Sequence, residues 1–355
     1  MKHRHSVILL LLSTIILLLS TCNKTGFDND TELFDEALQS SDTLSAEVIK
    51  RDIFDLEYGE IAYKYLEYIQ DTLPGRVART KKERETAAFI VRTLLDIGYS
   101  TDSIQIQPFN SGRRTYNQDW IFSGGEEIEN SQNIIVTKKG GSDKVIVIGA
   151  HYDSVGTHGV VDNGSGISIL LESALRLFDK ETPYTLRFIF FGHEETTADG
   201  SNYYVDSLSS SEKKEIILMI NVDSIIDGDN CYIFGGSFNN DGIIKNDWAA
   251  IQASEYAQDL GLEIYFQQPI LIEMFIGLGI TRGMSDYVPF NKAGITYIAF
   301  DAIKTNDDGM LIPMLLHSQY DDLDYLNNEF PGRVQKALRE YSVLLEYVLL
   351  NLTIK

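Results

Sequence analysis

The chain has 355 residues, of which 44% are hydrophobic, enough to bury one large core or two modest ones. Its formal net charge of −22 at pH 7 argues against nucleic acid or an anionic membrane surface as the main partner, because both attract basic proteins. The acidity also fits a soluble, secreted enzyme, but charge alone is weak evidence for that class.

The N-terminus has the pattern of an export signal. Basic side chains within residues 2–5 precede an apolar stretch over 7–19, which has the length of a secretory signal and is short for a transmembrane helix. The stretch ends in Leu19-Ser20-Thr21-Cys22, which resembles a bacterial lipobox, although Thr21 is a less usual residue before the cysteine. We predict a lipoprotein signal over 1–22 with Cys22 lipidated. The alternative is an ordinary signal peptide with an incidental cysteine.

Lipidation of Cys22 predicts an exported protein held to the bacterial cell envelope by its lipid alone, since several acyl chains on one residue give a stable anchor. Cys231 then has no disulfide partner, and its apolar surroundings predict a buried small side chain.

Residues 23–45 are polar and acidic without a clear period, so we predict a flexible tether there. The folded domain is expected over 46–355. The membrane leaflet and the oligomeric state remain open.

From residue 46 onward, helical and strand patterns alternate. Residues 46–72 are rich in helix formers, and residues 82–97 carry apolar side chains at helical spacing before Gly98, a natural end of a helix. Further helices are predicted over 164–178, 200–208, 243–259 and 328–350. Strands are predicted over 103–109, 133–138, 144–150, 186–191, 215–222, 230–235, 262–267 and 295–300.

Several predicted strands are near-continuous apolar runs, such as 145–148 and 188–191. Such runs are expected where helices cover both faces of a sheet. We therefore predict a single α/β domain, a three-layer αβα sandwich around a central mixed, mostly parallel sheet. The sequence contains no repeat, no low-complexity segment and no convincing boundary of a second domain.

Histidines and carboxylates follow the predicted buried strands. Ligands of open α/β sheets sit at the carboxyl ends of the strands, so these residues are expected to meet at one edge. They are His151 and Asp153 after strand 144–150, Glu194 and Glu195 after strand 186–191, Asp223 after strand 215–222, Asp162 at the start of the next helix, and His317 further on.

A single aspartate at a strand end is commonly a helix cap or a turn former. Two histidines and three carboxylates together are the ligand types of zinc. A bridging carboxylate with two further ligands per metal is typical of a two-metal site with ions about 3.5–4 Å apart. Neighbours that leave a strand point in different directions, so one residue of the Glu194-Glu195 pair can bind metal while the other faces the substrate water.

Six sequence blocks stand out along the chain: IVIGAHYDSVG, VDNGSGISILLESA, RFIFFGHEETTADGSNYYV, INVDSI, MSDYVPFNKAGITYIAF and LHSQYDDLDYLN. They occur in the order found in the zinc aminopeptidases of metallopeptidase family 28 (clan MH), and the chain resembles that family over about residues 60–350. The resemblance implies an aminopeptidase that acts on peptide substrates and uses two zinc ions. A hydroxide formed on those ions would attack the scissile carbonyl.

Carried over position by position, the resemblance also implies a role for each polar residue. His151 and Asp223 would bind one zinc, and Glu195 and His317 the other, with Asp162 bridging the two. Glu194 would act as general base and then as general acid. Asp153 would hold the imidazole of His151 in the right tautomer.

Some positions depart from the family pattern. Tyr287 follows Asp286 where the family often has histidine, and Ser318 follows the last metal histidine where threonine is common. These departures put substrate preference in doubt more than catalysis. We consider Asp286 and Tyr287 candidate residues of a substrate-binding wall. The alternative for Asp286 is an ordinary turn aspartate.

Two other functions are compatible with the same fold. Glutaminyl cyclases resemble this family but use one zinc; they usually have tryptophan where this chain has Leu316, and they usually lack the motif Asn163-Gly164-Ser165-Gly166. A non-catalytic binding module of the same fold would be expected to lack a metal ligand, and all five are present here. The native metal remains open, because nitrogen and oxygen ligands also accept Co or Mn.

Overall fold

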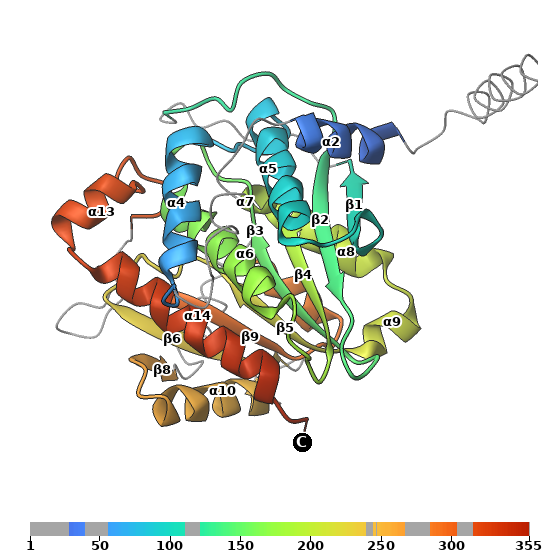
Figure 1. Ribbon diagram of the computed structural model, residues 1–355, viewed down its shortest axis with the longest axis vertical. Helices are drawn as coiled ribbons and strands as arrows, with labels where there is room; N and C mark the ends of the chain where they lie inside the picture. The colour runs from blue at the N-terminus through green and yellow to red at the C-terminus, as the bar shows by residue number, and fades with distance from the viewer. Residues whose placement is uncertain are drawn as a thin grey trace, which may run out of the picture.

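The structure, a computed structural model, describes residues 28–39, 56–110, 121–238, 244–245, 247–266, 285–303 and 315–354 (Figure 1). Within these residues a nine-stranded sheet has the order β1-β2-β4-β3-β5-β9-β6-β7, and β8 pairs with β6. The strands are β1 (Ile104–Phe109), β2 (Ser131–Lys138), β3 (Val145–His151), β4 (Thr185–Phe191), β5 (Ile216–Val222), β6 (Asn230–Phe238), β7 (Ile244–Lys245), β8 (Ile264–Phe266) and β9 (Tyr297–Ile303). The central strands β4, β3, β5 and β9 are parallel, and β1, β2 and β6 pair antiparallel on the two sides. The predicted mixed sheet with a parallel centre is confirmed.

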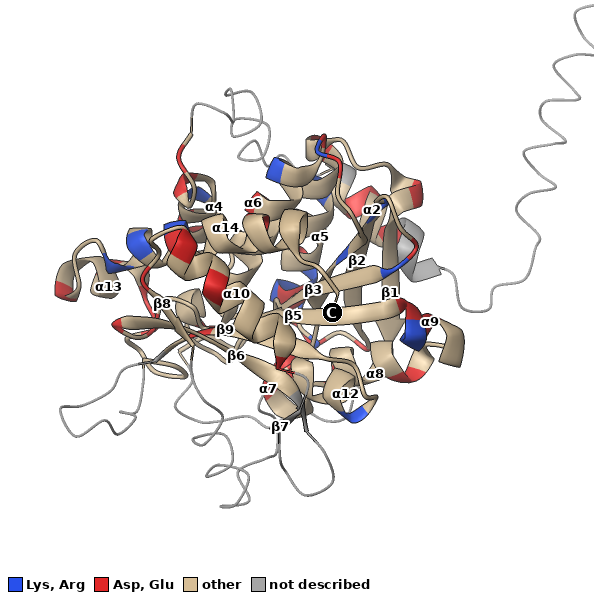
Figure 2. Cartoon of the chain, turned by 90° about the horizontal axis from the view of Figure 1, so that it is seen from below, with Lys and Arg blue, Asp and Glu red and all other residues tan. Residues whose placement is uncertain are grey.

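Helices cover both faces of this sheet. They are α2 (Asp28–Gln39), α4 (Glu60–Thr72), α5 (Lys81–Ile97), α6 (Ser165–Leu177), α7 (Glu194–Thr197), α8 (Asp199–Ser207), α9 (Ser210–Glu215), α10 (Trp248–Asp259), α12 (Tyr287–Lys292), α13 (Leu323–Glu329) and α14 (Arg333–Asn351), with short helical turns η2 (Thr101–Ser103) and η3 (Val160–Gly164). Figure 2 shows α4, α5, α6 and α14 on one side of the sheet and α7, α8 and α12 on the other. The predicted three-layer αβα sandwich is therefore confirmed.

The apolar runs of the central strands explain why the sheet is covered on both faces. In β3, Ile146 and Ile148 belong to the core under α6, whereas Val145 and Val147 belong to a second core on the opposite face. Successive side chains of a strand point to opposite faces, so an uninterrupted apolar run is stable only between two helical layers. This packing fixes the positions of the strand ends that carry the candidate site.

Most predicted elements are confirmed to within a few residues, but two helices differ. The predicted helix 328–350 begins only at Arg333 as α14, and residues 328–329 are the end of α13. Pro331 and Gly332 separate the two helices, and Gly332 has a φ of 81°, a left-handed conformation that glycine adopts at little cost. The predicted helix 243–259 begins only at Trp248, because residues 244–245 pair with β6 as β7. Residues 46–55 lie outside the described residues.

The prediction of a flexible tether over residues 23–45 is wrong for residues 28–39, the part that the structure describes. These residues form α2, which packs on α5 and β1. Leu33 and Ala37, one helical turn apart, are buried, and Glu36 forms an ion pair of 2.8 Å with Arg84 of α5. The apolar face of α2 is too short to stand out in a polar segment, so packing against the domain decides the structure.

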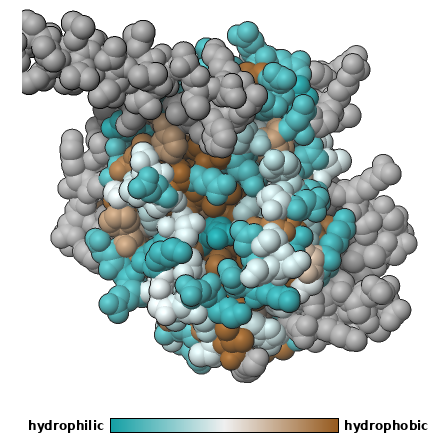
Figure 3. All heavy atoms as spheres, turned by 90° about the vertical axis from the view of Figure 1, so that its right-hand side faces the viewer, coloured by the Kyte–Doolittle hydropathy of each residue, from teal (hydrophilic) through white to brown (hydrophobic). Residues whose placement is uncertain are grey.

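The signal sequence over 1–22 and the lipidation site Cys22 lie outside the described residues and stay predictions. In the part of the chain that the structure describes, no helix combines the length and the apolar character needed to cross a bilayer. Cys231 is buried, as predicted, and is a free cysteine within the described residues. Figure 3 shows the molecule from the side of β1, where hydrophilic residues surround small, separate apolar areas.

Candidate metal centre

Three parallel neighbours of the sheet end at one edge, and each brings polar side chains to it. β3 ends at His151, β5 is followed by Asp223, and β4 is followed by the Glu194-Glu195 pair at the start of α7. Asp162 enters from η3, just before α6, and His317 from the segment before α13. The structure therefore brings all the residues of the predicted ligand set to the carboxyl edge of the sheet.

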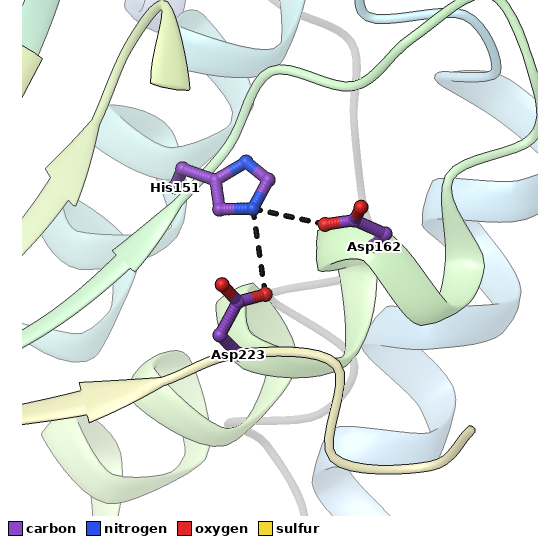
Figure 4. Close-up of side chains that lie close together, drawn as sticks. All are labelled: His151, Asp162 and Asp223. Atoms are coloured by element: carbon purple, nitrogen blue, oxygen red, sulfur yellow. Dashed lines mark ion pairs between the residues drawn. The ribbon is translucent and has the colours of Figure 1, made fainter. Parts of the chain in front are cut away.

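His151, Asp162 and Asp223 form a first group of possible ligands (Figure 4). The Nε2 atom of His151 lies 3.0 Å from Oδ1 of Asp162 and 3.5 Å from Oδ1 of Asp223. The imidazole and Asp162 are buried, and Asp223 is partly exposed. One nitrogen and two carboxylate oxygens thus converge from three different elements.

Asp162 also belongs to a second group, with Glu195 and His317. Oδ2 of Asp162 lies 3.0 Å from Nε2 of His317, and Oε2 of Glu195 lies 2.9 Å from the same nitrogen. Asp162 therefore presents one oxygen to each histidine. This is the arrangement expected of a carboxylate shared by two metal ions.

Buried negative charge surrounds these groups. Burial, together with repulsion by Asp162, raises the pKa of Glu195 to about 7, and burial raises the pKa of Asp286 to about 7. Burial also acts to raise the pKa of Asp162, but its hydrogen bonds with the two imidazoles outweigh burial and lower that pKa. Divalent cations would offset this excess of negative charge, and imidazole nitrogen with carboxylate oxygen is a donor set that zinc accepts. Each group of three is therefore chemically suited to one zinc ion.

Asp153 contacts both the His151 imidazole and the glutamate pair. The Nδ1 atom of His151 lies 3.1 Å from the main-chain carbonyl oxygen of Asp153 and 3.6 Å from its carboxylate, so the carbonyl is the closer partner of the imidazole. The Asp153 carboxylate instead accepts hydrogen bonds from the main-chain N–H groups of Glu194 (2.9 Å) and Glu195 (3.3 Å). Asp153 thus links the turn of the glutamate pair to the end of β3.

The Asn163-Gly164-Ser165-Gly166 motif explains why Asp162 lies beside Asp223. The Asn163 amide donates to the carbonyl oxygen of Val222, the last residue of β5, and its own oxygen accepts from the main-chain N–H of Gly166. A Cβ on Gly166 would lie only 2.4 Å from that Val222 oxygen. Glycine therefore allows the start of α6 to pack against the end of β5.

Comparison with known proteins assigns the chain to a family. Residues 133–342, more than half of the chain, match the description Peptidase family M28. The chain belongs to peptidase family M28. The resemblance inferred from the six sequence blocks is thereby confirmed.

Curated relatives of the chain match it to different extents. The alkaline phosphatase isozyme conversion protein of Escherichia coli K12 is 24% identical over 320 residues, which cover 79% of this chain and 87% of that protein. Aminopeptidase YwaD of Bacillus subtilis is 32% identical over 216 residues, 59% of this chain and 43% of YwaD. The probable lipoprotein aminopeptidase LpqL of Mycobacterium tuberculosis is 41% identical over 98 residues, 27% of this chain and 20% of LpqL. The matches thus span less than half the length of the latter two relatives.

Solved structures with the same fold include enzymes of two kinds. A zinc aminopeptidase from Bacillus subtilis superposes with a TM-score of 0.64 at 19% identity, covering 84% of this chain and 97% of that one. A glutaminyl cyclase from an Acidobacteriales bacterium gives a TM-score of 0.60 at 18% identity, covering 83% and 96%. At this level of identity, these likenesses establish the M28 fold and do not separate the two activities.

Further side chains of this M28 protein hold the ligands and were not predicted from the sequence. Ser285 donates to Oδ2 of Asp223 at 2.6 Å and accepts from the Asn221 amide at 2.8 Å. The buried Asp321 accepts from the main-chain N–H of Val161, next to Asp162, at 2.6 Å. Ser285 lies in the sequence block that contains Asp286, and Asp321 lies in the block that contains His317. Their place in these two blocks is the sequence feature that could have identified them as supporting residues.

The candidate substrate-binding residues are both buried in the M28 fold. Asp286 has no exposed surface, and its charge interacts with that of Glu194. The Tyr287 ring stacks on Tyr297 with centroids 4.3 Å apart, within the core on the α12 side of the sheet. Asp286 thus borders the predicted catalytic glutamate, and contact of either residue with substrate stays a prediction.

Metal-free protein should become less stable as the pH rises from about 5 to 8. The folded-state pKa values of Glu195 and Asp286 are about 7 and that of Asp321 about 8, whereas exposed carboxyls titrate near about 4. The folded state therefore binds more protons than the unfolded state in this range, and its stability falls as they are released. The pKa of His317, raised to about 11 because its imidazole donates hydrogen bonds to the carboxylates of Asp162 and Glu195, acts in the same direction.

Denaturant unfolding of chelator-treated protein at several pH values measures this effect, with zinc-loaded protein as the control. We expect the difference in unfolding free energy between the two forms to grow from pH 5 to pH 8. Equal stability of the metal-free form at both pH values would contradict the excess of buried negative charge.

Proposed function

We propose that the protein is a zinc-dependent aminopeptidase that hydrolyses the N-terminal residue from peptides, with two zinc ions per chain. The observation that carries the proposal is the position of Asp162, which faces His151 with one carboxylate oxygen and His317 with the other. Membership of peptidase family M28 supports hydrolysis of peptides, and relatives named as aminopeptidases support the N-terminal specificity. In this proposal His151 and Asp223 hold one ion, Glu195 and His317 hold the other, and Asp162 bridges them.

Glu194 is the proposed general base. Only 8% of its surface is exposed, and burial, with repulsion by Asp286, Glu195 and Asp223 in addition, raises its pKa well above the usual range. A buried carboxylate with raised proton affinity suits the removal of a proton from the attacking water and its return to the leaving amine. Lewis acidity, for the water and for the scissile carbonyl, is the chemistry that bound zinc supplies. The Asp153 carboxylate accepts from the main-chain N–H of Glu194 and so helps to orient the Glu194 side chain.

The electrostatic surroundings favour an α-amine over an α-carboxylate as the recognised end of the peptide. The charges of Asp227 and Asp301 interact with each other, and Asp301 also interacts with the metal-ligand candidate Asp223. When ionised, these two carboxylates and Asp286 add negative charge around the ligands. Such a field attracts a protonated amine and repels a carboxylate.

We also propose that the enzyme acts from the bacterial cell envelope, anchored through a lipid on Cys22. The apolar stretch and lipobox-like sequence at the N-terminus support the anchor. A relative named as a probable lipoprotein aminopeptidase is consistent with it. Mass spectrometry of the full chain expressed in a bacterial host would detect acyl groups on Cys22, and a Cys22→Ser variant should be released from the membrane fraction.

The function is tested by metal content together with cleavage of matched peptides. We expect about two zinc ions per chain, hydrolysis of aminoacyl anilides, and cleavage of a peptide with a free N-terminus but not of the same peptide with an acetylated N-terminus. Chelation should abolish the activity, and added zinc should restore it. One zinc ion with formation of pyroglutamate from an N-terminal glutamine peptide, without anilide cleavage, would instead identify a cyclase and refute the bridging role of Asp162.

A further inference from the structure

Arg76 is buried beside the loop that joins two of the metal-ligand candidates. Its side chain has no exposed surface, and its guanidinium donates to main-chain carbonyl oxygens on both ends of the loop of residues 152–159. Nε donates to Tyr152 O at 2.8 Å, Nη1 to His158 O at 3.0 Å, and Nη2 to Gly159 O at 2.7 Å. One planar group thus spans the loop from its first residue to its last.

Main-chain contacts tie the same loop to Arg76 a second time. The N–H of Arg76 donates to the hydroxyl of Ser154, and the N–H of Ser154 donates to the carbonyl oxygen of Arg76. Gly159 has a φ of 63°, and a Cβ there would lie 2.8 Å from Nη2 of Arg76. The glycine therefore leaves the space in which the guanidinium reaches its carbonyl.

Three ligand candidates depend on the position of this loop. His151 directly precedes it, and Asp162 follows it by three residues. In the middle of the loop, the N–H of Val155 donates to Oε1 of Glu195 at 2.9 Å, which leaves Oε2 facing His317. A shift of the loop would therefore move ligands of both groups at once.

We infer that Arg76 is a positioning residue that sets the geometry of both metal sites through the loop of residues 152–159. The inference rests on the proposed metal centre. It extends the functional unit to a residue outside the region 133–342 that matches the family. A lysine keeps the charge but has one nitrogen, which cannot span the carbonyl oxygens of Tyr152 and Gly159 as the guanidinium fork does.

The test is the Arg76→Lys variant of the full chain, measured by zinc affinity in chelator competition and by the visible spectrum of the Co²⁺-substituted protein. We expect zinc affinity about 10–100-fold weaker in at least one site, the usual loss when support of a ligand is removed, and a changed Co²⁺ ligand-field spectrum. We also expect kcat to fall more than KM rises, since the loop holds ligands rather than substrate.

Arg176→Lys is the matched control. Arg176 also bonds through a guanidinium fork, to Glu172 and to the carbonyl oxygens of Leu56 and Glu57, but it supports the start of α4 away from the metal site. This variant should lower thermal stability while keeping zinc affinity and the Co²⁺ spectrum. Gly159→Ala would crowd both Arg76 and Ser154, the two residues that tie the loop to the preceding segment. It is the second probe and should change the spectrum in the same way as Arg76→Lys.

The outcomes separate the inference from the proposed function. Wild-type protein that binds no zinc or cobalt would refute the metal centre itself. Wild-type metal binding with an unchanged affinity and spectrum in Arg76→Lys would overturn the role of Arg76 and leave the metal centre intact. An equal loss of affinity in Arg76→Lys and Arg176→Lys would show a general loss of stability and would also overturn it.

Discussion

Replacement of Glu194 by glutamine is expected to lower kcat by about 10²–10⁴-fold while zinc content stays unchanged, because the amide cannot take a proton from the attacking water. The substitution keeps the size of the side chain, and the main-chain N–H that binds Asp153 is not altered. The neighbouring Glu195 keeps its place against His317. Loss of activity without loss of metal is therefore the signature of a base that does not bind metal.

The measurement is steady-state hydrolysis of an aminoacyl anilide with metal analysis of the same samples. Glu181→Gln is the control, since Glu181 is exposed on the turn before β4 and should give wild-type rates. A Glu194→Gln variant that retains wild-type kcat would exclude Glu194 as the base. A variant that loses both activity and zinc would place Glu194 among the ligands.

The parts of the fold that follow from repeated local patterns could be predicted from the sequence. Apolar runs such as 145–148 marked the central strands, and Gly98 marked the end of α5. His151, Asp223 and the Glu194-Glu195 pair could be predicted because they stand at or just after strand ends, where the topology brings them to one edge. The residue types and their positions in the sequence were sufficient to predict these candidate site residues, although no distance between them was known. Asp162 and His317 do not follow a strand directly, and the family resemblance assigned them.

Other features depend on contacts between distant segments, which no local pattern contains. Arg76 is a single arginine in an irregular segment, and only the folded chain shows that it donates to a loop about 80 residues away. Asp153 was expected to hold the His151 imidazole, and its main-chain carbonyl oxygen lies 3.1 Å from that ring. The sequence did not show that its carboxylate accepts from the N–H groups of the glutamate pair. Helix α2 could not be predicted from the sequence for the same reason, because contacts with Arg84 and α5 stabilise it.

Replacement of Asp162 by asparagine is expected to abolish binding of both zinc ions. The loss of affinity should exceed the roughly 100-fold that is typical when a residue hydrogen-bonded to a metal ligand is replaced. Asp162 presents Oδ1 to His151 and Oδ2 to His317, each at 3.0 Å. An amide keeps one oxygen but replaces the other with an NH₂ group, which donates hydrogen bonds and carries no negative charge to share between cations. Activity should therefore fall below detection.

Single-histidine variants distinguish a shared carboxylate from an ordinary ligand. His151→Ala and His317→Ala should each weaken one site and leave the other able to bind, so both retain about one zinc ion, whereas Asp162→Asn should retain none. Stepwise chelator competition on the three variants measures this difference, and circular dichroism checks that each remains folded. If folded Asp162→Asn kept one tightly bound ion, Asp162 would belong to a single site, and the two groups of ligands would not form one bridged centre.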